Sequence, residues 1–141
     1  MFANGDNRTG ILSVLRNTQE HEFYLTGSKF FVGTGNDTDY FVADSQEVRK
    51  WLEFHGFNRI GSKEHNYNDT NCSALYRIIC PVEGQVDVQC LIDVEMKNTV
   101  QTILKKWGKN PKSDVIWDIM FEAYREGYVT GLSKLEVHHE V

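Results

Sequence analysis

The positions of apolar residues predict several amphipathic helices, because they recur every three or four residues. A short helix is expected over Gly10–Thr18. Another is expected from Ser45, a suitable N-cap, to about His55, with Gly56 as its stop. The longest stripe predicts a helix that ends near Trp107, and it consists of Met96, Val100, Ile103, Leu104 and Trp107.

Four shorter apolar runs have the composition and length of β-strands. Two of them cover residues 23–26 and 37–42. The other two, 74–80 and 85–92, flank a Pro81–Gly84 turn and predict a hairpin. Gly61–Ser73 is polar and is expected to be a loop. After the long helix, a last one is expected to start near Ser113 and to bury Ile116, Ile119, Met120 and Ala123.

The order of these elements predicts an α+β (α/β) fold, with a small mixed β-sheet flanked by helices. The chain has 141 residues, which suits a single domain over 1–141. Its core is expected over about residues 20–107, followed by a C-terminal helical extension over about 113–132.

Composition narrows the function without assigning one. The content of 40% hydrophobic and 25% charged residues is ordinary for a soluble globular protein, and the net charge of -5 disfavours a general nucleic-acid coat protein. The first nine residues are polar, and no apolar run approaches the roughly 18–20 residues of a membrane span, so we expect no membrane association and a cytoplasmic location. Three cysteines without close pairing predict neither a disulfide framework nor a zinc site.

Three aspartates stand out against the strand pattern. Side chains alternate along a strand, so Asp37 and Asp39 are expected to point the same way. Asp87 lies between Val86 and Val88, where a charge buried without a partner would be costly. Carboxylates on one face repel each other unless a cation lies between them, and Mg²⁺ takes oxygen ligands of this kind. The pattern predicts a divalent metal site at Asp37, Asp39 and Asp87.

A small-residue bend precedes these acids. Gly27 lacks a Cβ, which lets the backbone approach a phosphate closely. The Ser28 hydroxyl and neighbouring N–H groups are potential donors to phosphate oxygens, and Lys29 adds a positive charge. We therefore expect Gly27, Ser28 and Lys29 to contact a phosphate group.

This arrangement resembles the nucleotidyltransferase superfamily, which includes DNA polymerase β and the kanamycin nucleotidyltransferases. The residues that carry the resemblance are Leu25-Thr26-Gly27-Ser28, then Asp37-Thr38-Asp39-Tyr40-Phe41-Val42, then Val86-Asp87-Val88-Gln89. It extends over about residues 23–107 and is nearest to small phage-encoded nucleotidyltransferase-like proteins. It implies a nucleotidyltransferase-like fold with C-terminal helices and, for a phage-encoded protein, a location in the host cytoplasm.

The resemblance also implies an activity. A nucleoside monophosphate would pass from a nucleoside triphosphate such as ATP to a hydroxyl of a protein, an RNA or a small molecule. Ser28 would hold the triphosphate, Asp37 and Asp39 would bind Mg²⁺ or Mn²⁺, and Asp87 would complete the site and help to deprotonate the acceptor. The chain departs from the family in the eight residues from Lys29 to Asn36, a shorter spacing than usual, which bears on nucleotide affinity.

Other interpretations remain open from sequence. Asp37 and Asp39 also suit a turn after Gly35-Asn36, and Asp87 also suits an edge strand. The chain repeats its Gly-Ser-Lys tripeptide at 61–63 without a following Asp-x-Asp strand. The alternatives to an active enzyme are a catalytically weak or inactive binding module, acting as an inhibitor or decoy of a host protein, and one half of a two-component system. The sequence leaves the acceptor, the preferred nucleotide and the oligomeric state open.

Overall fold

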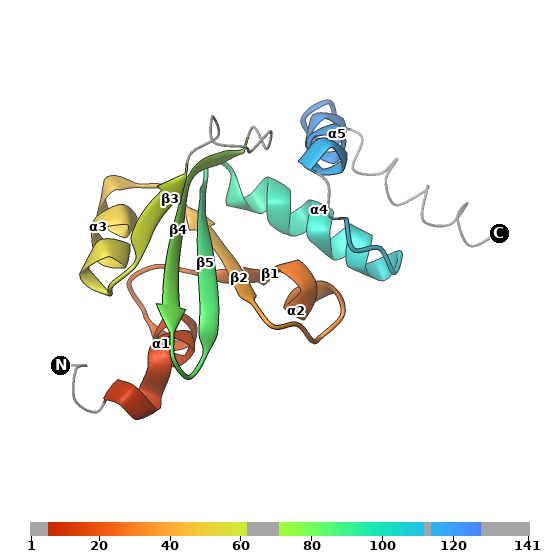
Figure 1. Ribbon diagram of the computed structural model, residues 1–141. Helices are drawn as coiled ribbons and strands as arrows, with labels where there is room; N and C mark the ends of the chain where they lie inside the picture. Colours follow the sequence, from red (N-terminus) through yellow and green to blue (C-terminus); the bar gives the residue numbers. More distant parts are fainter. Residues whose placement is uncertain (1–5, 62–70, 112–113, 128–141) are drawn as a thin grey trace.

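The computed structural model describes residues 6–61, 71–111 and 114–127 (Figure 1). In these ranges the chain forms five helices and five strands, in the order α1 (Asp6–Asn17), β1 (Tyr24–Thr26), α2 (Gly27–Phe31), β2 (Thr38–Ala43), α3 (Gln46–Phe54), β3 (Asn58–Gly61), β4 (Cys72–Cys80), β5 (Gly84–Leu91), α4 (Val94–Lys106) and α5 (Asp114–Arg125). The strands form one sheet in the order β1-β2-β5-β4-β3. Only the β2–β5 pair is parallel among these strands. The expected α+β fold with a small mixed sheet is therefore confirmed.

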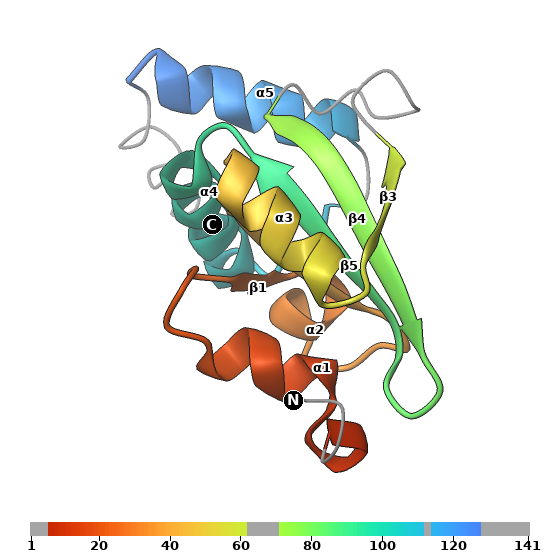
Figure 2. The same cartoon turned by 90° about the vertical axis from the view of Figure 1, so that its left-hand side faces the viewer.

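Helices cover both faces of the sheet (Figure 1, Figure 2). Helices α1 and α3 pack on one face, where Leu15 and Leu52 join Tyr40, Val42 and Val88 in the main hydrophobic core. Helices α2, α4 and α5 lie on the opposite side. There, a second core forms between α4 and α5 and consists of Met96, Val100, Leu104, Trp117 and Phe121. None of the described helices is both long enough and apolar enough to cross a membrane.

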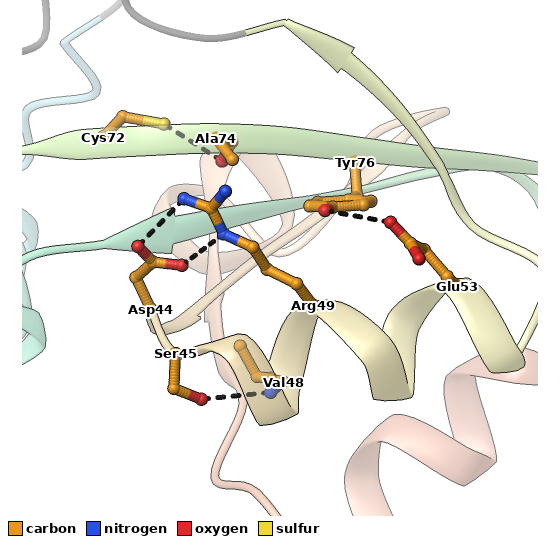
Figure 3. A network of polar contacts seen from close by, with 8 residues as sticks. All are labelled: Asp44, Ser45, Val48, Arg49, Glu53, Cys72, Ala74 and Tyr76. Atoms are coloured by element: carbon orange, nitrogen blue, oxygen red, sulfur yellow. Dashed lines mark hydrogen bonds and ion pairs between the residues drawn. The ribbon is translucent and has the colours of Figure 1, made fainter.

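Helix α3 forms where its sequence signals predict it. The Ser45 hydroxyl accepts a hydrogen bond from the Val48 N–H at 3.0 Å, and Gly56 follows the helix with a φ of 93°. Arg49 donates to both carboxylate oxygens of Asp44, at 2.7 and 3.0 Å (Figure 3). The helix is thereby fixed against the end of β2.

Helix α1 begins earlier than the apolar pattern predicts, at Asp6, and is kinked at Gly10, which has φ 69° and ψ 161°. The cause is a contact with the β4–β5 turn. Glu83 accepts a hydrogen bond from the Leu12 N–H at 3.0 Å, and a Cβ at Gly10 would lie 2.3 Å from a Glu83 oxygen. The part of α1 after the kink is the segment that the apolar spacing predicts.

Two expectations were wrong. Helix α5 does not bury Ile116 and Ile119, which are 41% and 58% exposed, because its larger aromatic side chains Trp117 and Phe121 face α4 instead. The region 61–73 is not wholly a loop: strand β3 ends at Gly61 and β4 already begins at Cys72. Residues 62–70, residue 113 and the end of the expected C-terminal extension, 128–132, lie outside the described residues.

Candidate functional site

Four polar side chains form a row across the sheet. The register pairs Thr26 of β1 with Asp39 of β2, Asp39 with Asp87 of β5, and Asp87 with Arg77 of β4. Residues paired in this way point to the same face of a sheet, and neighbouring strands are about 4.8 Å apart. The row lies on the side of the sheet that α2, α4 and α5 cover. Strand alternation therefore brings together Asp39 and Asp87, two of the three predicted acids.

Asp39 is the electrostatic centre of this row. Burial, and after it the negative charges of Asp87 and Asp37, raise the pKa of its carboxyl group to about 6. The positive charges of Lys97 and Arg77 oppose this shift. Both burial and the neighbouring carboxylates therefore disfavour the ionised form of Asp39, and a bound cation would favour it.

Gly27 lies directly against Asp39. The glycine has a φ of 70°, and a Cβ on it would lie 2.4 Å from an Asp39 carboxylate oxygen. Any other residue at position 27 would collide with Asp39 and strain the backbone. The bend before α2 is therefore shaped around this carboxylate, and Ser28 follows it at the start of the helix.

A pocket of about 350 Å³ opens beside Asp39. Strands β1, β2 and β5 contribute to its floor, while α2, α4 and α5 supply its walls. It is lined by Thr26, Gly27, Ser28, Phe31, Asp39, Gln89, Lys97, Asn110, Pro111 and Trp117. Gly27, Ser28 and Asp39, which the sequence pattern selects, all belong to this lining.

The other predicted residues, Lys29, Asp37 and Asp87, do not line this pocket. Asp37 is exposed and immediately precedes β2. Lys29 lies on α2, but its ammonium group donates to the hydroxyl of Thr38, a buried side chain next to Asp39 in the strand. Because neighbours in a strand point to opposite faces, this contact directs Lys29 away from the face that carries Asp39.

Asp87 is held by an arginine that the sequence pattern does not select. Arg77 donates from Nε and Nη2 to the two Asp87 oxygens, at 2.8 and 3.1 Å. The Asp87 side chain is 13% exposed and that of Arg77 is 35% exposed. This hydrogen bonding raises the pKa of Arg77 and fixes the orientation of the Asp87 carboxylate.

Helix α4 supplies two buried polar side chains that were also missed. Lys97 and Gln101 are 3% and 1% exposed. Gln101 accepts from the Thr26 hydroxyl at 2.7 Å and donates to the Leu25 carbonyl oxygen at 3.0 Å, which ties α4 to β1. Their spacing in the sequence could have indicated that both face the sheet. They lie four residues apart, and each directly follows a member of the apolar stripe.

The donor set suits a divalent cation. Oxygen ligands from Asp39 and Asp87 lie on adjacent strands, with Asp37 two residues before Asp39. A carboxylate has about four lone-pair positions, so Asp87 retains acceptor capacity beside Arg77. Within the described ranges, no three His, Cys, Asp or Glu side chains already converge as a ligand cluster. Metal binding would therefore require Asp37 to turn toward Asp39 or oxygen ligands from a substrate.

A larger hollow of about 1170 Å³ lies elsewhere, between the end of α1 and α3. Trp51, Phe54 and His55 contribute aromatic rings to its walls. It is wide and open, and it lacks a pair of carboxylates on adjacent strands. The smaller pocket at Asp39 is the better candidate site because its polar groups converge.

Comparisons of the chain with protein families, with curated proteins and with solved structures returned no match. The candidate site therefore rests on its own geometry.

Proposed function

We propose that the chain is a metal-dependent nucleotidyltransferase that transfers a nucleoside monophosphate from a nucleoside triphosphate to a hydroxyl acceptor. The observation that carries the proposal is the pairing of Asp39 with Asp87 on adjacent parallel strands, with Gly27 packed against Asp39. Asp37 and Asp39 are the proposed ligands of Mg²⁺ or Mn²⁺, and Asp87 completes the site. The donor is a cytoplasmic metabolite, so the proposal places the protein in the cytoplasm.

The reaction makes one bond and breaks one. The acceptor oxygen attacks the α-phosphorus while the bond from that phosphorus to the bridging oxygen breaks. The electron pair leaves with pyrophosphate. Metal bound at the aspartates would supply Lewis-acid activation of the attacking oxygen and charge compensation of the leaving group. Ser28 would donate to the phosphate oxygens, and Asp87 would take up the acceptor proton. The acceptor is a protein, an RNA or a small molecule.

Nucleotide labelling tests this function. The protein is incubated with labelled nucleoside triphosphates, Mg²⁺ or Mn²⁺ and a cell extract, in parallel with Asp39→Ala and with Asp44→Asn as a matched control. Asp44 directly follows β2, is paired with Arg49 and does not line the pocket. We expect transfer by wild type and by Asp44→Asn, and at least about a 100-fold loss in Asp39→Ala. Absence of metal-dependent nucleotide binding together with no transfer, or equal transfer by wild type and Asp39→Ala, would reject the proposal.

One observation favours a second candidate, an inactive binding module on the same fold. Arg77 occupies both Asp87 oxygens, so a cation is already present where a metal-dependent enzyme would expose a carboxylate. Such a module would bind its protein partner equally well after Asp37→Asn and Asp87→Asn. Loss of the bound partner in either variant, measured by calorimetry, would count against this alternative.

A further inference from the structure

Lys97 is the buried cation in the wall of the candidate pocket. It lies in the first half of α4, its side chain is 3% exposed, and it lines the same cavity as Ser28 and Asp39. Removing an ammonium group from water is costly unless the protein compensates it. A lysine at this position therefore calls for a specific role.

One amide oxygen and two aromatic rings surround its ammonium group, and its positive charge also acts on the carboxylate of Asp39. Lys97 Nζ donates to Gln89 Oε1 at 2.7 Å, and it lies 4.6 Å from the centre of the Trp117 ring and 5.4 Å from that of Phe41. These three side chains come from β5, α5 and β2. An amide oxygen and two aromatic faces orient this cation in the pocket that Asp39 also lines. The arrangement keeps a positive charge at a defined place in the pocket wall.

The contrast with Lys29 shows which lysine serves the pocket. Lys29 is next to Ser28 in sequence, yet its ammonium bonds to Thr38 on the opposite side of β2. Lys97 is 69 residues after Ser28, yet both side chains line the same cavity. The Gly-Ser-Lys sequence suggests that Lys29 lines the pocket beside Ser28. In the structure Lys97 takes this position instead.

We infer that the Lys97 ammonium binds the oxygens of the phosphates that leave as pyrophosphate, and that it thereby distinguishes nucleoside triphosphates from monophosphates. The inference rests on the proposed function. As the bond from the α-phosphorus to the bridging oxygen breaks, the electron pair stays with pyrophosphate. A fixed positive charge next to that group stabilises the developing negative charge. Lysine binds phosphate oxygens as a positive point charge.

Dissociation constants measured with Mn²⁺ test the inference. The ligands are the tri-, di- and monophosphate of one nucleoside, and the proteins are wild type, Lys97→Met, Lys29→Met and Lys105→Met. Lys105 also lies on α4, but it is exposed and lies over the Phe30 ring instead of lining this pocket. We expect Lys97→Met to weaken triphosphate binding by about 10- to 100-fold and monophosphate binding by less than about 3-fold. We expect the other two variants to bind as wild type does.

The outcomes separate this inference from the proposed function. Triphosphate binding by wild type that is unchanged in Lys97→Met, or weakened equally for all three ligands, overturns the role of Lys97 and leaves the function standing. No triphosphate binding by wild type overturns both. Should Lys97→Met fail to fold, Gln89→Leu retains the lysine but removes the amide that orients it. Gln89→Leu should weaken triphosphate binding less than Lys97→Met does, and it should weaken triphosphate binding more than monophosphate binding. An equal loss of affinity for all three ligands contradicts the inference.

Discussion

The two faces of the sheet are made by alternate residues of the same strands. On the face that α1 and α3 cover, β2 and β5 place Tyr40, Val42 and Val88, all at most 5% exposed. On the other face, the same strands place Asp39 and Asp87 side by side. The first face is apolar, whereas the second combines the smaller core of α4 and α5 with carboxylates whose mutual repulsion opposes folding. We conclude that the first face contributes most of the stability, and that the second is organised for ligand binding at some cost in stability.

The largest effect on stability should follow a change in the apolar face. Leu52 of α3 is fully buried in its core. Leu52→Ala removes apolar contacts and leaves a cavity, which should lower the free energy of unfolding by about 2–5 kcal/mol. Urea denaturation followed by circular dichroism measures this. Below its melting temperature the variant should keep the metal and nucleotide affinity of wild type.

The control for this comparison is on the same helix. Phe54 is 84% exposed, so Phe54→Ala should change the free energy of unfolding by less than about 0.5 kcal/mol. A loss in Leu52→Ala as small as that in Phe54→Ala would show that α3 is not part of the stabilising core.

The next effect should be an increase in the free energy of unfolding. It should arise on the face of the sheet that carries Asp39 and Asp87, called the acid face below. Because burial and neighbouring carboxylates raise the Asp39 pKa to about 6 from an ordinary value near 3.8, folding favours the protonated form. This contribution to stability is fully present below about pH 3.8 and is lost as the pH rises through 6. In metal-free buffer at pH 7, Asp39→Asn should therefore be more stable than wild type. The full shift corresponds to about 3 kcal/mol, and solvent screening reduces the expected gain to about 1–2 kcal/mol.

Melting temperatures measured between pH 4 and 7.5 in a chelating buffer test this sign. Wild type should lose stability across this range relative to Asp39→Asn. Added Mn²⁺ should then stabilise wild type but not the variant, since only wild type retains the charged ligand. A variant that is less stable than wild type at pH 7 without metal would show that Asp39 supports the fold.

The sequence predicts the two faces unequally. Strand alternation and helix capping are local properties, so residues such as Val88 and Ser45 reveal their roles in the sequence itself. The pairing of Asp39 with Asp87 was also predictable, because both stand out in strand patterns. Arg77 and Lys97 were not, because the pairing of Arg77 with Asp87 depends on the exact register of the predicted hairpin, and the role of Lys97 depends on α4 crossing the same face of the sheet.

The same distinction accounts for the misassigned elements. Local spacing on α5 fits both Ile116 and Trp117 as inward residues, and the packing partner on α4 decides between them. Strand β3 has four residues and an irregular register with β4, so it carries little local signal. In both cases the deciding interaction comes from a segment distant in sequence.

The smallest effect should separate two ion pairs of nearly equal geometry. Arg49 binds Asp44 at 2.7 and 3.0 Å, and Arg77 binds Asp87 at 2.8 and 3.1 Å. Asp44→Asn removes a partly exposed pair and should lower the free energy of unfolding by about 1 kcal/mol. Asp87→Asn removes a similar pair but also relieves repulsion with Asp39, so its loss should be below about 0.5 kcal/mol.

The pH dependence of these two variants shows whether the charges near each ion pair, and not only its distances, determine its contribution to stability. The Asp87 charge contributes to the raised Asp39 pKa, so Asp87→Asn should lower that pKa and flatten the fall in stability between pH 4 and 6 in metal-free buffer. Asp44 is not among the charges that raise it, and Asp44→Asn should keep the slope of wild type. Equal losses of stability with identical slopes would mean that the acid face behaves as an ordinary ion-paired surface. A smaller loss and a flatter slope in Asp87→Asn than in Asp44→Asn would locate the repulsion between Asp39 and Asp87, which a bound cation would relieve.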